Sequence, residues 1–255
     1  MNTVEKMNII VTGGASGIGR ATAGMLSERG ASVMIADRDH ARVEEMVLEI
    51  RSRKGSQNIA GCTMDVRLAA DCERMMRNAE EQFGELDAVV HCAGILRSKG
   101  SRPRPVHDID ETEYDEVMGI NLKGTFLVNR AALQTFMPKK RGQIINLSST
   151  SGQKGRPLDG IYSASKAGII ALTESIAEEV RAFGIRVLAI IPDAVDTPLW
   201  TQNGGINAAP QGALPAERVA EVILMILSLP PDILCENLVV APMRLRTHRN
   251  QLAVI

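Results

Sequence analysis

Six short apolar runs, separated by longer segments, constrain the fold of this chain more than any other feature. Each run is apolar nearly throughout rather than at every second residue, which is typical of strands covered on both faces. The runs are NIIVT (8–12), SVMIAD (32–37), LDAVVHCAG (86–94), GQIINLSS (142–149), IRVLAIIP (185–192) and NLVVAP (237–242). Between the runs, helical spacing appears, as in Ile169, Leu172, Ile176 and Val180. This alternation predicts an α/β fold: a doubly wound parallel sheet of about seven strands with helices on both faces.

Length and composition favour one domain over residues 1–255. A chain of 255 residues with 45% hydrophobic residues buries a substantial core, and no linker or internal repeat interrupts it. In such folds ligands bind beyond the carboxyl ends of the strands, so functional residues are expected directly after the runs. Two irregular stretches, 95–109 and 199–214, also follow strand-like runs and are predicted to be loops over a site.

Charge and cysteine usage exclude several classes of partner. The net charge of −1 and pI near 6.5 give no bias toward nucleic acid or an anionic membrane, which leaves small molecules. The apolar run Ile9 to Val11 is too short for a signal peptide or a membrane span, so we expect a cytoplasmic protein. The four cysteines lack the paired spacing of a metal site, which indicates reduced structural thiols and no metal.

A glycine-rich turn, TGGASGIGRA (12–21), joins the first run to a helix expected to begin near Ile18. Gly13, Gly17 and Gly19 lack the side chains that would keep a pyrophosphate from the backbone amides and the positive helix N-terminus. Ser16 lies in the same turn and adds no positive charge. Because this glycine-rich turn comes directly after the first strand, we interpret it as a nucleotide-binding turn rather than a merely tight one.

The second run ends in Asp37, eighteen residues after Gly19. An acidic side chain at this place accepts hydrogen bonds from the adenosine ribose hydroxyls and repels a 2′-phosphate, which favours NAD. Arg38, the next residue, can instead pair with a 2′-phosphate, so NADP stays open as the alternative.

Seven motifs together resemble the short-chain dehydrogenase/reductase family, in that family's order and spacing over nearly the whole chain. They are TGGASGIG (12–19), Asp65 in MDV, HCAG (91–94), Asn121 in INLKGTF, Ser149 in NLSSTSG, YSASK (162–166) and IPDAVDTP (191–198). The resemblance implies a Rossmann-fold oxidoreductase that interconverts a secondary alcohol and a ketone with a nicotinamide cofactor.

By this resemblance, the catalytic residues are Asn121, Ser149, Tyr162 and Lys166. Tyr162 is expected to exchange the proton with the substrate oxygen as general acid or base, and Ser149 to hydrogen-bond that oxygen. Lys166, one helical turn after Tyr162, is expected to favour the phenolate and to bind the nicotinamide ribose. Asn121 is expected to hold a water that links the lysine to solvent.

The resemblance also implies a set of cofactor contacts. They comprise Gly13, Ser16, Gly17, Ile18, Gly19, Asp37, Arg38, Asp65, Val66, Cys92, Ala93, Gly94, Tyr162, Lys166, Pro192, Val195 and Thr197, with the backbone around Ile95. Two positions depart from the family pattern. His91-Cys92 replaces Asn-Asn, and His91 is interpreted as a structural hydrogen-bonding residue. Asp193 replaces a glycine, which puts close contact with a ligand at that turn in doubt and leaves a substrate contact as an alternative.

Substrate specificity is expected from the 95–109 loop, from residues 150–160 and from the 199–214 stretch, which the family uses as a lid. The basic residues there are Arg97, Lys99, Arg102, Arg104, Lys154 and Arg156. They are interpreted as a solvated surface, with the alternative that Lys154 or Arg156 binds an anionic group of the substrate. Trp200 is expected to pack within the lid.

Assembly and two alternative functions complete the expectations. The resemblance implies a homotetramer or homodimer formed through the helices that contain Asn121 and Tyr162. An NADPH-dependent biosynthetic ketoreductase is the first alternative, motivated by Arg38. A catalytically silent dinucleotide-binding sensor or partner subunit is the second, motivated by the altered motifs at His91 and Asp193.

Overall fold

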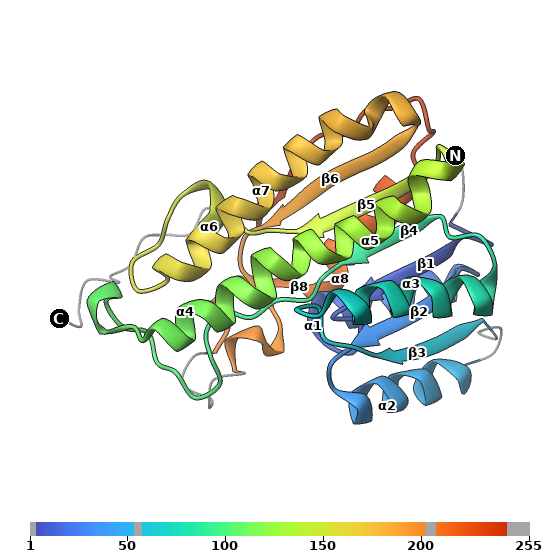
Figure 1. The fold of residues 1–255 in the computed structure, drawn as a ribbon. Helices are drawn as coiled ribbons and strands as arrows, with labels where there is room; N and C mark the ends of the chain where they lie inside the picture. The colour runs from blue at the N-terminus through green and yellow to red at the C-terminus, as the bar shows by residue number, and fades with distance from the viewer. Residues whose placement is uncertain (1–3, 54–57, 202–207, 244–255) are drawn as a thin grey trace.

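The computed structural model describes residues 4–53, 58–201 and 208–243, and in this part of the chain a seven-stranded parallel sheet forms the centre (Figure 1). The strand order is β3-β2-β1-β4-β5-β6-β9, and every neighbouring pair is parallel. The strands are β1 (Asn8–Thr12), β2 (Ser32–Asp37), β3 (Ile59–Thr63), β4 (Ala88–His91), β5 (Gly142–Leu147), β6 (Ile185–Pro192) and β9 (Leu238–Val240). The predicted fold class is confirmed.

All six apolar runs of the sequence contain strands, but β3 lies in none of them. This strand lies at the edge of the sheet, where only Ile59 and Cys62 are buried, whereas Gly61 and Thr63 are exposed. Because one side of an edge strand faces solvent, its sequence, IAGCT, lacks a continuous apolar run.

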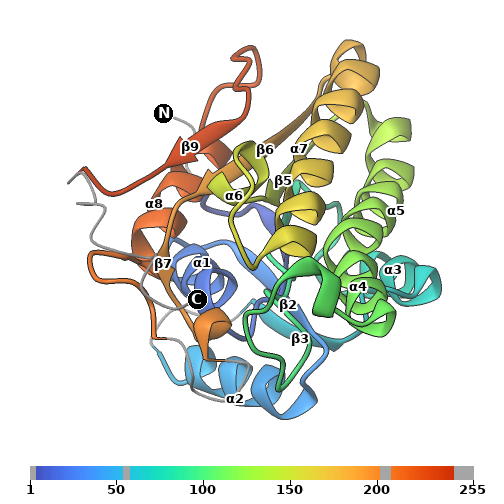
Figure 2. The ribbon, with the colours of Figure 1, turned by 90° about the vertical axis from the view of Figure 1, so that its left-hand side faces the viewer.

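Helices cover both faces of the sheet (Figure 2). One face packs against α1 (Gly17–Glu28), α2 (His40–Arg51) and α8 (Ala216–Leu227), and the other against α3 (Ala69–Phe83), α5 (Gly124–Lys139) and α7 (Gly160–Val180). Successive side chains of a strand point to opposite faces, so Ile9 and Val11 belong to the first core and Ile10 to the second. Burial on both sides explains why these strands are apolar throughout.

The carboxyl ends of the strands meet at one edge, which faces the viewer in Figure 2. Here lie α4 (Glu111–Met118), which continues through a π-helical turn, η2 (Gly119–Lys123), into α5, and the short α6 (Thr150–Gln153). A separate two-stranded parallel ladder pairs β7 (Val195–Asp196), which comes after β6, with β8 (Leu214–Pro215), which comes before α8. Short 3₁₀ turns are η1 (Val106–Asp108), η3 (Arg181–Phe183) and η4 (Pro198–Trp200).

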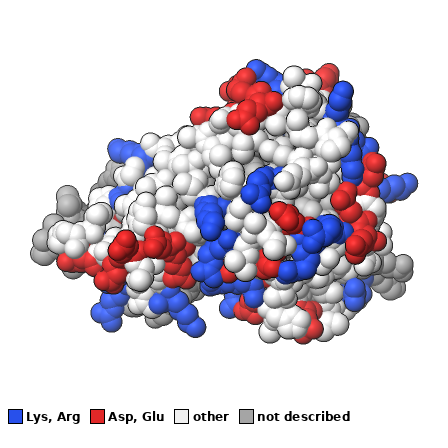
Figure 3. All heavy atoms as spheres, viewed as in Figure 1, with Lys and Arg blue, Asp and Glu red and all other residues white. Residues whose placement is uncertain are grey.

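The two irregular stretches of the sequence follow strands β4 and β6. Residues 95–109 contain only η1 as a regular element, and the described parts of 199–214 contain the end of η4 and the start of β8, while 202–207 lie outside the described residues. Among the described helices, none combines the length and apolar character needed to cross a bilayer. On the face shown in Figure 3, the surface over α5 and α7 is mostly uncharged, with acidic and basic side chains interspersed around it.

Candidate functional site

The first two turns of α7 place Tyr162 and Lys166 together at the carboxyl edge of the sheet. Their four-residue spacing puts both on one face of the helix, and the Lys166 Nζ lies 5.6 Å from the centroid of the Tyr162 ring. Both side chains are buried. The Lys166 ammonium donates a hydrogen bond of 2.8 Å to the carbonyl oxygen of Leu147, the last residue of β5. The lysine is therefore fixed between a helix and a strand end.

Ser149 follows β5 by two residues and forms the N-cap of α6. Its Oγ accepts a hydrogen bond of 3.1 Å from the backbone N–H of Ser151. The Ser149 hydroxyl group also lies close enough to that of Tyr162 to lower the pKa of the phenol. Two hydroxyl groups from separate elements thus meet at one point, where both can contact the same substrate oxygen.

Asn121 lies in the π-helical turn between α4 and α5 and is fully buried. Its Nδ2 donates to the carbonyl oxygen of Ile95 at 2.9 Å and to the Ser165 Oγ at 3.0 Å, and its Oδ1 accepts from the Ile95 N–H at 2.9 Å. A Cβ atom at Gly94 would lie 3.3 Å from this Oδ1 and 3.5 Å from the Lys166 Nζ. Asn121 therefore holds the segment after β4 against the lysine, and the widened turn is a feature that often marks functional sites.

Burial controls the proton affinity of the central pair. Desolvation raises the pKa of Tyr162 to about 12, although the hydrogen bond from Ser149 lowers it. The neighbouring charges of Asp159 and Arg156 have smaller and opposite effects on this pKa. Desolvation likewise lowers the pKa of Lys166 to about 8. The expected effect of the Lys166 cation on the phenolate is not among these causes, and burial keeps Tyr162 a protonated phenol at neutral pH.

The glycine turn packs against the segments that follow β4 and β6. Gly13 and Gly17 have φ of +62° and +50°, values that L side chains rarely adopt. A Cβ at Gly13 would lie 2.7 Å from the backbone nitrogen of Ala93, and one at Gly17 would lie 3.2 Å from the Thr197 Cβ. A Cβ at Gly19 would overlap the carbonyl group of Gly13. Three regions predicted to contact the cofactor are therefore adjacent.

The start of α1 is open to a ligand. Ser16 is its N-cap, with extended backbone and no side-chain capping hydrogen bond, while Ile18 packs against the core. Backbone N–H groups at the start of a helix have no partner within the helix and attract anions. The glycines place no side chains at the start of this twelve-residue helix. The result is a cradle of the kind that the pyrophosphate of a dinucleotide occupies.

Asp37 ends β2 beside this turn. Its carboxylate accepts hydrogen bonds from the backbone N–H groups of Ala15 (3.3 Å) and Asp39 (3.2 Å), which fix its position next to the glycine turn. Arg38 is exposed, and its charge lowers the pKa of Asp65 as one of several effects.

Asp65 and Val66 follow β3. The side chain of Asp65 is bound by Arg67 at 2.5 Å, and hydrogen bonding from that guanidinium lowers the pKa of the carboxyl group. Val66 is buried, and a Cβ at Gly124 would lie 2.8 Å from its Cγ2. Because its side chain belongs to the core, Val66 can offer only its backbone to a cofactor.

His91 and Cys92 occupy the altered motif at the end of β4. The His91 Nδ1 shares a hydrogen bond of 2.7 Å with the Thr12 Oγ1, while its Nε2 has no partner among the described residues. Burial, with a smaller effect of Lys166, lowers the pKa of His91 to about 3, so the imidazole is neutral. Cys92 donates its backbone N–H to the Thr12 carbonyl oxygen, and burial raises the pKa of its thiol to about 12. Both residues tie β4 to β1.

Asp193 shows why a glycine is dispensable after β6. Its φ is not positive, and its N–H donates to the carbonyl oxygen of Val240 at 2.8 Å, so the turn needs no left-handed residue. The carboxylate accepts hydrogen bonds from Arg156 at 2.9 Å and from the Thr150 Oγ1 at 3.0 Å. Arg156 is therefore paired within the protein, which weakens the hypothesis that it binds a substrate anion.

Two further predicted cofactor contacts, Pro192 and Val195, lie at the end of β6 and in the segment that follows it. Pro192 ends β6, and Val195 begins β7 with a buried side chain. The carbonyl oxygen of Val195 accepts a hydrogen bond of 2.8 Å from the Trp200 Nε1. Trp200 thus packs within its own segment, as expected.

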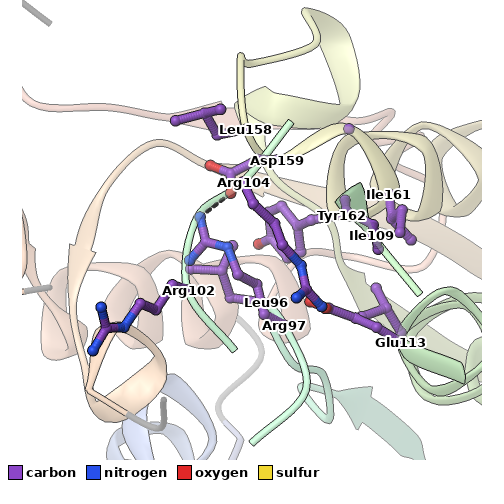
Figure 4. A pocket seen from close by; sticks show the side chains of 12 residues that line it. Leu96, Arg97, Arg102, Arg104, Ile109, Glu113, Leu158, Asp159, Ile161 and Tyr162 are labelled. Carbon is purple, nitrogen blue, oxygen red and sulfur yellow. Dashed lines mark hydrogen bonds and ion pairs between the residues drawn. The ribbon is translucent and has the colours of Figure 1, made fainter. Parts of the chain in front are cut away.

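A pocket lies beside Tyr162, and charged residues from three segments line it (Figure 4). Arg97 pairs with Asp159, and Arg104 pairs with Glu113 at 2.5 Å. The interpretation of Arg97 as solvated surface is wrong, because only 9% of this residue is exposed. Asp159 and Glu113 were not predicted as site residues. The one signal in the sequence was the position of Asp159, three residues before Tyr162.

Comparisons with known proteins agree with this geometry. A model described as short chain dehydrogenase matches residues 7–205. An ipsdienol dehydrogenase of Ips pini is 37% identical over 215 residues, which cover 81% of each chain. The crystal structure of levodione reductase is similar at a TM-score of 0.83, with 26% identity over 94% of this chain and 97% of the other. A 3-ketoacyl-(acyl-carrier-protein) reductase from Brucella melitensis complexed with NADH gives a TM-score of 0.82, with 27% identity over 94% of this chain and 98% of the other.

Proposed function

Since the chain belongs to the short-chain dehydrogenase family, we propose that it is an NAD-linked oxidoreductase that interconverts a secondary alcohol and its ketone by hydride transfer. The observation that carries this proposal is the buried Tyr162, which lies beside Ser149 and one helical turn from Lys166. This group lies at the carboxyl edge of the sheet, where ligands of such folds bind.

Tyr162 acts as general acid in ketone reduction and as general base in alcohol oxidation. A pKa of about 12 keeps its phenol protonated at neutral pH, so it can donate a proton to a carbonyl oxygen, which favours reduction. Ser149 donates a hydrogen bond to the same oxygen. Lys166 carries its charge below a pH of about 8, and Asn121 connects it with solvent through water while holding the backbone at Ile95.

A nicotinamide dinucleotide fits the residues present and, when bound, supplies or accepts the hydride. The glycine cradle at the start of α1 would hold the pyrophosphate, because backbone N–H groups at an uncapped helix start attract anions. Asp37 binds the adenosine ribose, while Gly94 and Thr197 line the path toward Lys166 and the nicotinamide.

NAD is favoured by Asp37, whose carboxylate is fixed beside the glycine turn and would repel a 2′-phosphate. The relative from Brucella melitensis, complexed with NADH, supports this choice. A second candidate is an NADPH-dependent ketoreductase, which the exposed Arg38 favours because it forms no ion pair with another described residue.

Titration of the purified protein with NADH and with NADPH, followed by calorimetry, tests the proposal. We expect at least tenfold tighter binding of NADH, about 1.4 kcal/mol. Arg38→Gln separates the two candidates, since removing this charge should weaken the binding of NADPH more than that of NADH. A preference for NADPH would support the second candidate, and binding of neither cofactor would contradict the oxidoreductase proposal.

We further propose a homodimer or homotetramer formed through α4, α5 and α7. The part of this face over α5 and α7 is mostly uncharged in Figure 3, and α4 and α5 expose Tyr114 and Phe126, of which 47% and 45% are accessible. Apolar and aromatic groups are enriched in the centres of interfaces. Light scattering should return two or four times the mass of the chain, and a single species of 27.6 kDa would contradict this assembly.

A further inference from the structure

We propose that the substrate of this enzyme carries an anionic group, such as a carboxylate, which Arg97, Arg102 and Arg104 bind in the pocket beside Tyr162. This inference rests on the proposed alcohol and ketone chemistry and adds the substrate class. It differs from the sequence-based hypothesis, which placed an anion on Lys154 or Arg156.

The arginines at the pocket differ in how they are paired. Arg97, Arg102 and Arg104 line the pocket together with Asp159 and Glu113. Arg97 is paired with Asp159, and Arg104 with Glu113 at 2.5 Å and with Asp110 at 3.3 Å. Arg102 is exposed and forms no ion pair with another described residue. Its guanidinium group is therefore the one at the pocket that no carboxylate of the described residues holds.

Unused hydrogen-bond donors point to the same ligand chemistry. The Nε of Arg97 is buried without a hydrogen-bond partner among the described residues, and so is the Nε of Arg104. A buried donor without an acceptor costs free energy, which a bound acceptor recovers. Guanidinium groups match the geometry of carboxylate and phosphate oxygens, so an anion fits these donors better than a neutral group does.

The arginines lie in the same pocket as Tyr162, so they can bind the anionic end of a substrate whose carbonyl end reacts at the tyrosine. Arg97 and Arg104 lie on either side of the Tyr162 hydroxyl in Figure 4, and all three side chains line the same pocket. Apolar side chains of Leu96, Ile109 and Val117 complete the wall, and these suit a short carbon chain.

Keto acids and their methyl esters test the inference as matched pairs. The pairs are 3-oxobutanoate, 4-oxopentanoate and 5-oxohexanoate with their esters, which vary the distance between ketone and carboxylate. Reduction is followed as oxidation of the preferred reduced cofactor. We expect kcat/KM for at least one acid to exceed that for its ester tenfold or more, because only the acid offers a carboxylate to the unpaired guanidinium group and to the unused Nε donors.

Two exposed basic residues of the same loop provide the matched variants. Arg102→Gln removes the unpaired charge at the pocket and should lower the acid-to-ester ratio of kcat/KM several-fold. Lys99→Gln is the control, because Lys99 is exposed in the same loop but does not line the pocket. Its ratio should equal that of the wild type. Calorimetry of the preferred acid with the cofactor-saturated enzyme should show the same loss of affinity in Arg102→Gln alone.

Each unfavourable outcome has a distinct meaning. Equal reduction of acids and esters would overturn the anion inference while leaving the oxidoreductase proposal intact. An equal loss in Arg102→Gln and Lys99→Gln would also overturn it, since it would indicate general electrostatic attraction rather than this pocket. If the enzyme binds NADH but neither reduces nor binds any of the acids, the inference fails, whereas failure to bind cofactor would contradict the proposed function itself.

Discussion

Replacing Tyr162 by phenylalanine should lower turnover by about a thousandfold, the middle of the range for loss of a general acid. The substitution removes only the hydroxyl group beside Ser149, so the buried ring keeps its packing beside Lys166. The variant should therefore still bind the cofactor. Steady-state rates with the preferred cofactor, together with calorimetry of cofactor binding, measure both effects.

Tyr114→Phe is the matched control, because Tyr114 is the other tyrosine of the chain and lies exposed on α4. It should keep wild-type turnover. Wild-type activity in Tyr162→Phe would refute the assignment of this residue as general acid and base. A wild-type protein that binds cofactor and turns over no alcohol or ketone would instead favour the catalytically silent sensor.

Gly19→Ala should weaken cofactor binding at least tenfold and lower the free energy of unfolding by about 1–3 kcal/mol, the usual cost of overpacking. The new Cβ would overlap the carbonyl group of Gly13, and its nearest other contacts are backbone atoms of Gly13 and Gly14. Backbone cannot rotate away as a side chain can, so the turn that receives the pyrophosphate must shift. Titration with NADH and urea denaturation measure the two effects.

Gly24→Ala in the same helix provides the comparison. A Cβ there would meet only the ends of the Arg53 and Met46 side chains, both at 3.9 Å. Alanine is the better helix former by about 1 kcal/mol, so this variant should be as stable as the wild type or more stable, with unchanged cofactor affinity. If Gly19→Ala lowers the stability but leaves the cofactor affinity unchanged, the glycine turn is merely tight and does not form the cofactor cradle.

The fold was largely predictable, because burial on both faces of a parallel sheet forces continuous apolar runs that a reader of the sequence can find. The exception, β3, is half exposed at the edge and therefore lacks such a run. Tyr162 and Lys166 were predictable as neighbours, since residues four apart share one face of a helix. The glycine turn was readable for a similar reason, because it follows the first strand directly.

Contacts between distant segments were beyond prediction. The pairing of Arg156 with Asp193, and of Arg97 with Asp159, joins residues 37 and 62 positions apart, and no local pattern encodes either pair. For that reason Arg97 was interpreted as a solvated charge although it is buried.

Most strands, the glycine turn and the residues that follow the predicted strands could be read from the chain alone, because these depend on local periodicity and backbone sterics. The protonation of Tyr162 and the partners of the arginines around it could be read from the folded protein only. Those properties depend on how completely segments from different parts of the chain exclude water from a group, and desolvation arises only when the whole fold is assembled.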